Sequence, residues 1–234
     1  MLETAGRALF RWRSFTPLAL LAVAIPLLWR SRGTASALWY VGGLLLCLSG
    51  QALRAWVLGL VPEGTSGQNE TLEADRLNTT GPYALMRNPL YLGNLAITLG
   101  LCLIAHDLWL LAAVALLFAL QYAAIIAAEE KFLAERFGEQ YQAYRAGVPR
   151  FWPRLAKMHA APWNWKRALK KEHNPAAAWI AIAVVLLGLD HRTRWPYLLA
   201  LALLAAAWLS VKGWKHRWLR GSFAADLRRR LSAR

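Results

Sequence analysis

The chain has 234 residues, of which 57% are hydrophobic, and it carries a formal net charge of +15. A soluble domain usually has about 45–50% apolar residues, and here the apolar residues are gathered into uncharged runs. This pattern argues against an ordinary soluble domain and predicts an all-α, polytopic helical membrane protein. The two cysteines, Cys47 and Cys102, both lie inside such runs, so they indicate no disulfide framework.

The uncharged runs predict about six transmembrane helices. A helix that crosses the hydrocarbon core needs roughly 17–25 residues, and flanking Lys or Arg side chains extend the reach of shorter runs. Many of the 13 tryptophans lie near the ends of these runs, where interfacial aromatic residues are expected. In chain order the predicted spans are Ser14–Trp29, Gly33–Leu53, Asn88–Ala105, Leu108–Ala128, Asn174–Leu189 and Trp195–Val211.

The basic residues predict how these spans are oriented. Lys and Arg are concentrated in the first 13 residues, in Glu129–His173 and in the tail from Lys212. The positive-inside rule places all three segments in the cytosol. His106-Asp107 then forms the outer turn of a tight hairpin made by spans three and four. Basic residues beside spans indicate anionic lipid headgroups as partners rather than nucleic acid, and the composition favours a bacterial cytoplasmic membrane.

The stretch "GPYALMRNPLYLGN", residues 81–94, opens the third predicted span. It begins with a Gly-Pro turn, and Pro89 suits the first turn of a helix, where its missing N–H costs nothing. Asn88 is then the expected N-cap. Arg87, beside a helix N-terminus, is suited to bind a carboxylate or a phosphate.

The segment that follows the fourth predicted span also has helical spacing. At ~100° per residue, Glu130 shares one face with Leu133, Phe137, Tyr141 and Tyr144. Glutamate is rarely buried without a partner. Glu130 and Arg87 are predicted on the same side of the membrane, which leaves two interpretations open. They form either a binding site for a zwitterionic ligand or a salt bridge that holds the hairpin together.

Together these two blocks carry a recognisable set of motifs. The residues are Gly81-Pro82-Tyr83, Arg87-Asn88-Pro89-Leu90-Tyr91-Leu92-Gly93, Glu129-Glu130, Leu133, Phe137-Gly138, Tyr141, Tyr144, Val148-Pro149-Arg150 and Pro153. In this order they resemble the integral membrane methyltransferases that include isoprenylcysteine carboxyl methyltransferases and phospholipid N-methyltransferases. The resemblance covers about a third of the chain. It implies a cytosolic pocket for S-adenosylmethionine, released as S-adenosylhomocysteine, and it implies no metal.

The resemblance also implies roles for individual residues. Arg87 and Glu130 would be the catalytic pair: Arg87 would bind the carboxylate of the cofactor, and Glu130 would bind an amine or a hydroxyl. Tyr91 would pack beside the cofactor, and Arg150 would contact the cofactor or a headgroup, or serve as an interfacial anchor. The full set of expected cofactor-binding residues is Tyr83, Arg87, Asn88, Pro89, Tyr91, Gly93, Glu129 and Glu130. Tyr141 and Tyr144 are expected in the core.

Two departures from the family pattern concern the site. Asn88 stands where the family usually has histidine, so one polar contact is changed. The isoprenylcysteine enzymes tend to carry an arginine one helical turn before the paired glutamates, whereas Ala123–Ala128 is apolar here. A prenylcysteine carboxylate therefore lacks a partner at that position.

These observations predict three segments and one leading function. Residues 1–80 form two spans and a connector, residues 81–153 form the methyltransferase core, and residues 154–234 add a basic segment and two further spans. Within the last segment, residues 163–174 are expected to form a surface helix that binds headgroups. The predicted function is methyl transfer to a lipid or lipophilic acceptor that enters from the bilayer. The alternatives are an enzyme like the membrane sterol reductases, using NADPH, and a non-catalytic binding protein.

Overall fold

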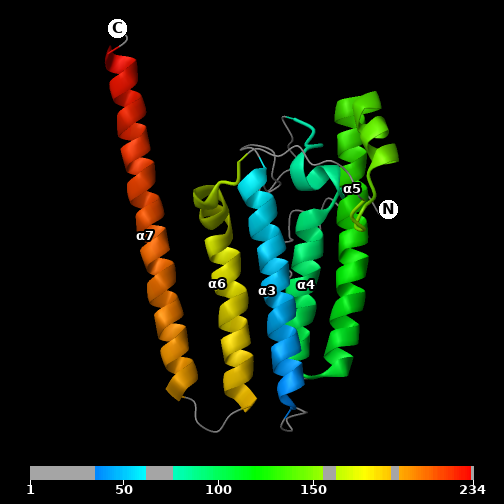
Figure 1. Cartoon of the computed structure of the whole chain (residues 1–234), viewed down its shortest axis with the longest axis vertical. Coiled ribbons are helices and arrows are strands. Elements are labelled where there is room, and N and C mark those ends of the chain that lie inside the picture. Colours follow the sequence, from blue (N-terminus) through cyan, green and yellow to red (C-terminus); the bar gives the residue numbers. More distant parts are fainter. Residues whose placement is uncertain (1–34, 62–75, 155–161, 191–194, 233–234) are drawn as a thin grey trace. The chain divides into compact units, whose positions relative to one another are not determined.

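The structure is a computed structural model that describes residues 35–61, 76–154, 162–190 and 195–232, with side chains described as far as Lys215. Its elements are α3 (Ala37–Leu60), the short 3₁₀ helix η1 (Gly81–Ala84), α4 (Pro89–Ile104), α5 (Leu108–Gly147), α6 (Trp165–Asp190) and α7 (Trp195–Ser232), as Figure 1 shows. The described segments contain helices and no strand. The predicted all-α class is therefore confirmed.

Within the described residues, four helices are long and apolar enough to cross a membrane: Ala37–Leu60, Leu108–Gly147, Trp165–Asp190 and Trp195–Lys215. α4, which corresponds to the third predicted span, is apolar but has only 16 residues. At 1.5 Å per residue it is about 24 Å long, less than the ~30 Å hydrocarbon core. The predicted span Ser14–Trp29 lies outside the described residues. A polytopic helical membrane protein is confirmed, and the number of spans stays a prediction.

The contacts divide the chain into two compact units, one up to Ala168 and one from Leu169 onward. In the second unit Trp208 Nε1 donates a hydrogen bond to Asn174 Oδ1 at 2.8 Å. Residues 165–174, expected in a surface helix, form the first turns of α6, which runs without a break through Pro175. A proline removes one backbone hydrogen bond, and the helix continues on the others. Headgroup binding by this segment stays a prediction.

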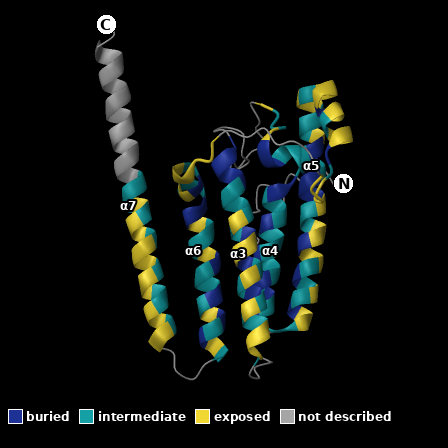
Figure 2. Ribbon diagram, viewed as in Figure 1, coloured by how far each residue is buried: buried dark blue, intermediate teal, exposed yellow. Residues whose placement is uncertain are grey.

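In the first unit, α3 and α4 pack through two pairs of glycines. A Cβ on Gly43 would lie 2.6 Å from the Gly100 carbonyl oxygen, and one on Gly50 would lie 2.6 Å from that of Gly93. On each helix the two glycines are seven residues apart, which places them on the same face two turns apart. Small residues allow membrane helices to approach this closely. The pairing is antiparallel, and buried positions recur along these helices in Figure 2.

α4 and α5 form the tight hairpin that the sequence predicts. His106 has a positive φ of 44°, and Asp107 caps α5 because its Oδ1 accepts a hydrogen bond from the Leu110 N–H at 2.9 Å. α4 packs against both α3 and α5. The end of α3, the start of α4 and the later part of α5 therefore meet on one side, where η1 also lies (Figure 1).

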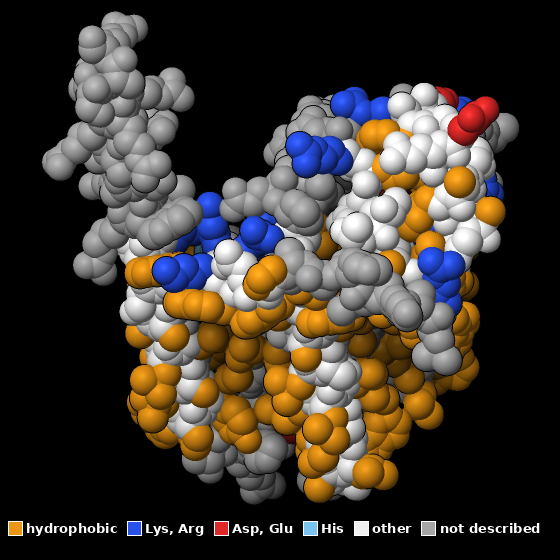
Figure 3. All heavy atoms as spheres, turned by 45° about the horizontal axis from the view of Figure 1, so that its top comes forward, with side chains coloured by type: hydrophobic (Ala, Val, Ile, Leu, Met, Phe, Trp, Pro, Cys, Tyr) orange, Lys and Arg blue, Asp and Glu red, His pale blue; other side chains and the backbone are white. Residues whose placement is uncertain are grey.

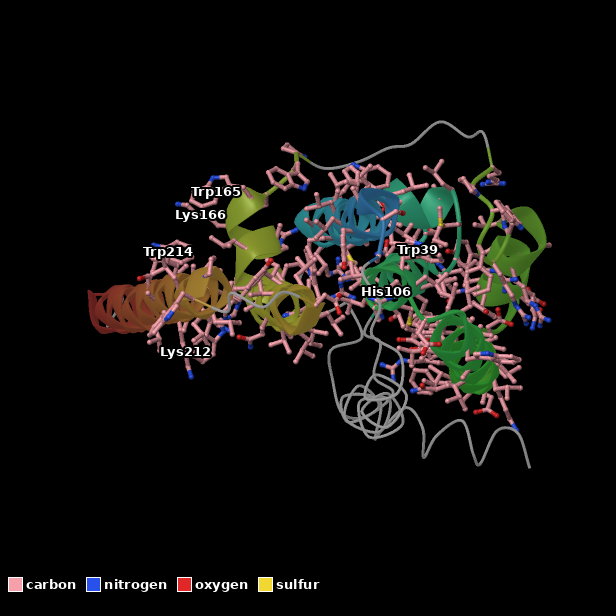
Figure 4. All side chains as sticks on the ribbon, turned by 90° about the horizontal axis from the view of Figure 1, so that it is seen from below. Trp39, His106, Trp165, Lys166, Lys212 and Trp214 are labelled. Atoms are coloured by element: carbon pink, nitrogen blue, oxygen red, sulfur yellow. The ribbon has the colours of Figure 1, made fainter. Side chains whose placement is uncertain are left out.

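The helix shafts expose apolar side chains, as expected of surfaces that face lipid. Leu45 on α3 and Leu120 on α5 are each 62% exposed. Figure 3 shows hydrophobic side chains covering the helix shafts, with Lys and Arg side chains gathered near helix ends. Figure 4 shows Trp165 and Lys166 together at the start of α6, where the Lys166 ammonium lies 5.6 Å from the Trp165 ring centre. Such basic and aromatic pairs suit a membrane interface.

Candidate functional site

The site begins at η1, where the chain turns before entering α4. Gly81 has a φ of +57°, a conformation that glycine adopts without strain, so the predicted Gly-Pro turn is confirmed. The Tyr83 side chain is half-buried, and its carbonyl accepts a hydrogen bond from the Tyr144 hydroxyl at 2.9 Å. This bond ties the first motif, residues 81–94, to the last turns of α5.

Asn88 stands at the N-cap position of α4, with Pro89 as the first helical residue, as predicted. The predicted role of its side chain is wrong, however, because it makes no capping hydrogen bond. Asn88 Nδ2 donates instead to the Arg150 carbonyl at 3.3 Å. The amide therefore binds the second motif, residues 129–153, and does not cap the helix.

Backbone hydrogen bonds join the two motifs directly. The Arg87 N–H donates to the Pro149 carbonyl at 2.8 Å, and the Asn88 N–H donates to the Arg150 carbonyl at 3.0 Å. The Arg154 N–H donates to the Leu85 carbonyl at 3.0 Å. Segments about sixty residues apart in the sequence are thus paired side by side, and this pairing closes the hairpin of α4 and α5.

The prediction of one continuous face along residues 130–144 is wrong at one position. Gly138 has φ 50° and ψ −125°, and the helix kinks there. Glu130 before the kink and Tyr141 after it are both buried, as expected. The kink turns the last part of α5 back (Figure 1), so that Tyr144 and Arg150 reach the first motif.

Arg87, Glu130 and Arg150 form a compact ion cluster. Arg87 Nη1 donates to Glu130 Oε1 at 2.7 Å. Arg150 binds both oxygens of the same carboxylate, with Nε 2.9 Å from Oε1 and Nη2 2.7 Å from Oε2. The Arg87 and Glu130 side chains are 12% and 10% exposed, whereas that of Arg150 is 50% exposed. The pair predicted from the sequence therefore lies inside, and Arg150 covers it from the surface.

The electrostatics of the cluster leave a cation in excess. Two guanidinium groups surround one carboxylate, and the hydrogen bond to Glu130 raises the pKa of Arg150 above its ordinary value. Arg87 Nε is buried and makes no hydrogen bond within the described part of the chain. A further acceptor would therefore satisfy this donor, and an anionic one would also balance the charge.

The ion cluster is the first of three polar layers, and the second layer is formed by Glu129 and Tyr91. Glu129 is half-buried and accepts a hydrogen bond from the Tyr91 hydroxyl at 2.6 Å. The Tyr91 ring meets the Tyr122 ring edge to face, with centres 4.7 Å apart. The structure thus brings together Arg87 with Glu130 and Tyr91 with Glu129, and both pairs span α5 and the start of α4.

A third polar layer, which the sequence did not predict, involves α3. Arg54 Nη1 donates to Asn94 Oδ1, and Asn94 Nδ2 donates to the Tyr122 hydroxyl at 3.0 Å. Gly93 provides the space, because a Cβ there would lie 2.6 Å from Arg54 Cγ. The signal in the sequence was a single arginine at the end of an apolar run, which an ordinary interfacial position also explains.

Comparison with known proteins finds a family match within the first unit. The model of the phospholipid methyltransferase family matches residues 38–140. The predicted resemblance to membrane methyltransferases is confirmed over these residues. They include α3 from Leu38, η1, α4 and α5 up to Gln140, and therefore every residue of the three polar layers except Arg150. No solved structure matches this chain.

Two curated relatives are similar over shorter stretches. The cobalt-zinc-cadmium resistance protein CzcN of Cupriavidus metallidurans is 46% identical over 80 residues, which are 34% of this chain and 37% of the relative. The nickel-cobalt-cadmium resistance protein NccN of Alcaligenes xylosoxydans xylosoxydans is 40% identical over 91 residues, or 39% of this chain and 40% of the relative. The matched segments thus span well under half of each relative. Among the described residues, no group of three or more His, Cys, Asp or Glu side chains is arranged to hold a metal ion.

The ion cluster fits the methyl donor used by such methyltransferases. The methionine end of S-adenosylmethionine carries a carboxylate and an ammonium, and the cluster offers excess guanidinium charge beside one carboxylate. The buried Arg87 Nε supplies an unsatisfied donor at the same place. The residues present therefore match the charges of that end of the cofactor.

Proposed function

We propose that this chain is an integral membrane methyltransferase that uses S-adenosylmethionine to methylate a lipid or a lipophilic small molecule. The observation that carries the proposal is the cluster of Arg87, Glu130 and Arg150, in which the two motifs expected to hold the cofactor meet. The family match over residues 38–140 supports the same reaction class.

In the proposed complex, the three side chains of the cluster bind the cofactor instead of one another. Arg87 and Arg150 bind the carboxylate of the methionine end, and Glu130 binds its ammonium. Each charge then keeps a partner of opposite sign, so no buried charge is left uncompensated. Tyr91, held by Glu129, packs beside the cofactor. The remaining expected contacts are Tyr83, Asn88, Pro89 and Gly93, which shape the start of α4.

When bound, S-adenosylmethionine supplies an electrophilic methyl group: the S–C bond breaks with its electron pair left on sulfur while a lone pair of the acceptor forms the new bond to carbon. Arg87 and Glu130 contribute by fixing one end of the donor, which aligns the reacting atoms. The site therefore works by alignment, and the acceptor enters laterally from the bilayer.

The proposed location is a bacterial cytoplasmic membrane with the cofactor site in the cytosol. The end of α3, the start of α4 and the later part of α5 lie on one side, and Arg87, Arg145, Arg150 and Arg154 belong to that side. The positive-inside rule assigns such a side to the cytosol.

The test begins with cofactor binding by the purified full chain in lipid nanodiscs. Binding of S-adenosylhomocysteine is measured by calorimetry for the wild type, Arg87→Ala, Glu130→Gln and the control Glu135→Gln. Glu135 is on the same helix, but its side chain is 56% exposed and lies 4.0 Å from Lys131. We expect affinity to fall about tenfold or more in the two cluster variants, as for the loss of a charged hydrogen bond, and to be unchanged in the control.

Transfer of labelled methyl from S-adenosylmethionine into a membrane lipid extract is measured on the same samples. Label that enters the lipid phase and is released as methanol by base identifies a methyl ester, and base-stable label identifies an N- or S-methylated acceptor. Binding of NADPH without binding of S-adenosylhomocysteine would replace the proposal with a reductase-like function. If neither cofactor binds, the cluster has only a structural role, which is to hold the hairpin of α4 and α5 together.

A further inference from the structure

A polar cluster lies inside the apolar part of the first unit, beyond the predicted cofactor residues. Its members are Arg54 of α3, Asn94 of α4 and Tyr122 of α5, joined by hydrogen bonds from Arg54 to Asn94 and from Asn94 to Tyr122. Arg54 lies within a candidate membrane span. An ionisable residue in a span is costly and most often marks a functional site.

A simpler role for Arg54 would be to reach outward to the membrane interface, as Lys and Arg do near helix ends. The structure shows the opposite direction. The stem of Arg54 crosses Gly93, where a Cβ would meet Arg54 Cγ at 2.6 Å, and its guanidinium binds the amide of Asn94. The side chain is therefore directed between α3 and α4, through a gap that only the missing side chain of Gly93 leaves.

The cluster has a definite hydrogen-bonding polarity. Asn94 Oδ1 accepts from Arg54, so its NH₂ group faces Tyr122 and donates to that hydroxyl. Because the Tyr122 oxygen accepts this bond, Tyr122 acts as a donor toward other groups. A guanidinium carries five N–H donors, so Arg54 can bind several oxygen atoms at once. The cluster therefore contains hydrogen-bond donors and a positive charge.

The cluster adjoins the layer predicted to contact the cofactor. The Tyr122 ring packs against the Tyr91 ring, whose hydroxyl binds Glu129. Burial and the charge of Glu129 raise the pKa of Tyr83, while the charge of Arg54 lowers it, so both charges act on the same phenol. Asn94 is about 7.5 Å into α4 at 1.5 Å per residue. We expect the polar end of a lipid to reach this depth while its chain stays in the hydrocarbon.

We propose that Arg54, positioned by Asn94 and Gly93, determines specificity by binding an anionic oxygen group of the lipophilic acceptor. This inference rests on the proposed methyltransferase function and names its acceptor class. The anionic group is a carboxylate or a phosphate. A fixed cation attracts either group and repels an alkylammonium, so an acceptor whose reactive end is a protonated amine is disfavoured.

The test uses photoreactive lipid probes of equal chain length that differ only in their polar end: a carboxylic acid, its methyl ester, a phosphate monoester and a primary amine. Each is crosslinked to the full chain in neutral nanodiscs, and labelling of the α3 and α4 peptides is quantified. The variants are Arg54→Gln, Arg54→Lys, Tyr122→Phe and, as a control for lost charge, Arg76→Gln, since Arg76 is exposed on the connector.

We expect the wild type to be labelled by an anionic probe about tenfold more than by the ester or the amine, as for a charged hydrogen bond. Arg54→Gln removes this preference, Arg54→Lys keeps part of it, and Arg76→Gln leaves it unchanged. Preference for the acid assigns the site to a carboxylate, and preference for the phosphate monoester assigns it to a phosphate headgroup. Equal labelling by acid, ester and amine, or an equal loss in Arg76→Gln, overturns the proposal.

Methyl transfer separates this inference from the proposed function. Where the acceptor is anionic, Arg54→Gln raises the KM for the acceptor and leaves S-adenosylhomocysteine binding intact, and Arg54→Lys partly restores the KM. Normal transfer with an unchanged acceptor KM in Arg54→Gln contradicts the inference alone. A wild type that binds no S-adenosylhomocysteine but still shows the Arg54-dependent probe preference contradicts the proposed function alone. Thermal unfolding of each variant verifies that it is folded.

Discussion

Gly43 of α3 lies so close to Gly100 of α4 that a Cβ on Gly43 would be 2.6 Å from the Gly100 carbonyl oxygen. The neighbouring Gly42 has nothing within 4 Å of the same added atom. The two adjacent glycines therefore form a matched pair for testing the helix contact.

We expect Gly43→Ala to destabilise the protein by about 1–3 kcal/mol, the usual cost of overpacking a tight contact. Gly42→Ala should be neutral or slightly stabilising, because alanine favours the helix by up to about 1 kcal/mol. The measurement is thermal unfolding in nanodiscs. Equal effects of the two substitutions would show that α3 and α4 do not pack at this face.

Gly138 is predicted to be required for the turn in α5. Its φ of 50° and ψ of −125° are strained for any residue with a side chain, and Gly138→Ala should cost about 1–3 kcal/mol. Gly147→Ala is the control in the same segment, since Gly147 has no positive φ. Hydrogen exchange should rise in residues 139–147 only for Gly138→Ala, and unchanged protection there would contradict the kink.

Arg87 and Glu130 are expected to be energetically coupled before any ligand binds. Glu130→Gln leaves the largely buried Arg87 without its carboxylate, whereas Arg87→Met leaves Glu130 paired with the half-exposed Arg150 alone. In the double variant neither member of the buried pair is charged. A double-mutant cycle on unfolding free energy should give a coupling of about 1–3 kcal/mol. Additive effects would mean that the ion pair contributes no net stability in the ligand-free protein.

Arg167 is expected to stabilise the end of α3. Its Nη1 donates to the Val61 carbonyl at 2.7 Å, while Trp163 Nε1 donates to the Ala55 carbonyl at 3.3 Å. Arg167→Ala should lower the unfolding free energy by about 1–3 kcal/mol, as for a lost charged hydrogen bond. Lys166→Ala should have little effect, because Lys166 is exposed over Trp165. A larger effect from Lys166→Ala would contradict this account.

The sequence predicted the local features of the site well, because they follow from local chemistry. Apolar runs gave the helices, Pro89 marked the start of α4, and helical spacing placed Glu130 on a buried face. The role of the Asn88 side chain was predicted wrongly because it depends on a distant part of the chain. Its amide binds the Arg150 carbonyl, a partner 62 residues away that no local rule can identify.

The remaining differences have the same physical origin. The preference for an N-cap is an average over helix starts, and a stronger tertiary hydrogen bond replaced it at Asn88. At Gly138 a conformation open to glycine interrupted a periodicity that looked continuous in the sequence. The inward path of Arg54 was not predicted, because Gly93, which makes this path possible, lies on another helix.

The backbone bonds of Arg87 and Asn88 to Pro149 and Arg150 have a consequence for the membrane itself. They join the open ends of a hairpin that the His106-Asp107 turn already joins at the other end, so α4 and all of α5 lie within one closed ring. Neither leg can gain a helical turn, about 5.4 Å, unless the other gains one too. In a thicker membrane we therefore expect the bilayer to thin around this hairpin, or its flanking residues to reach outward, rather than either leg to lengthen.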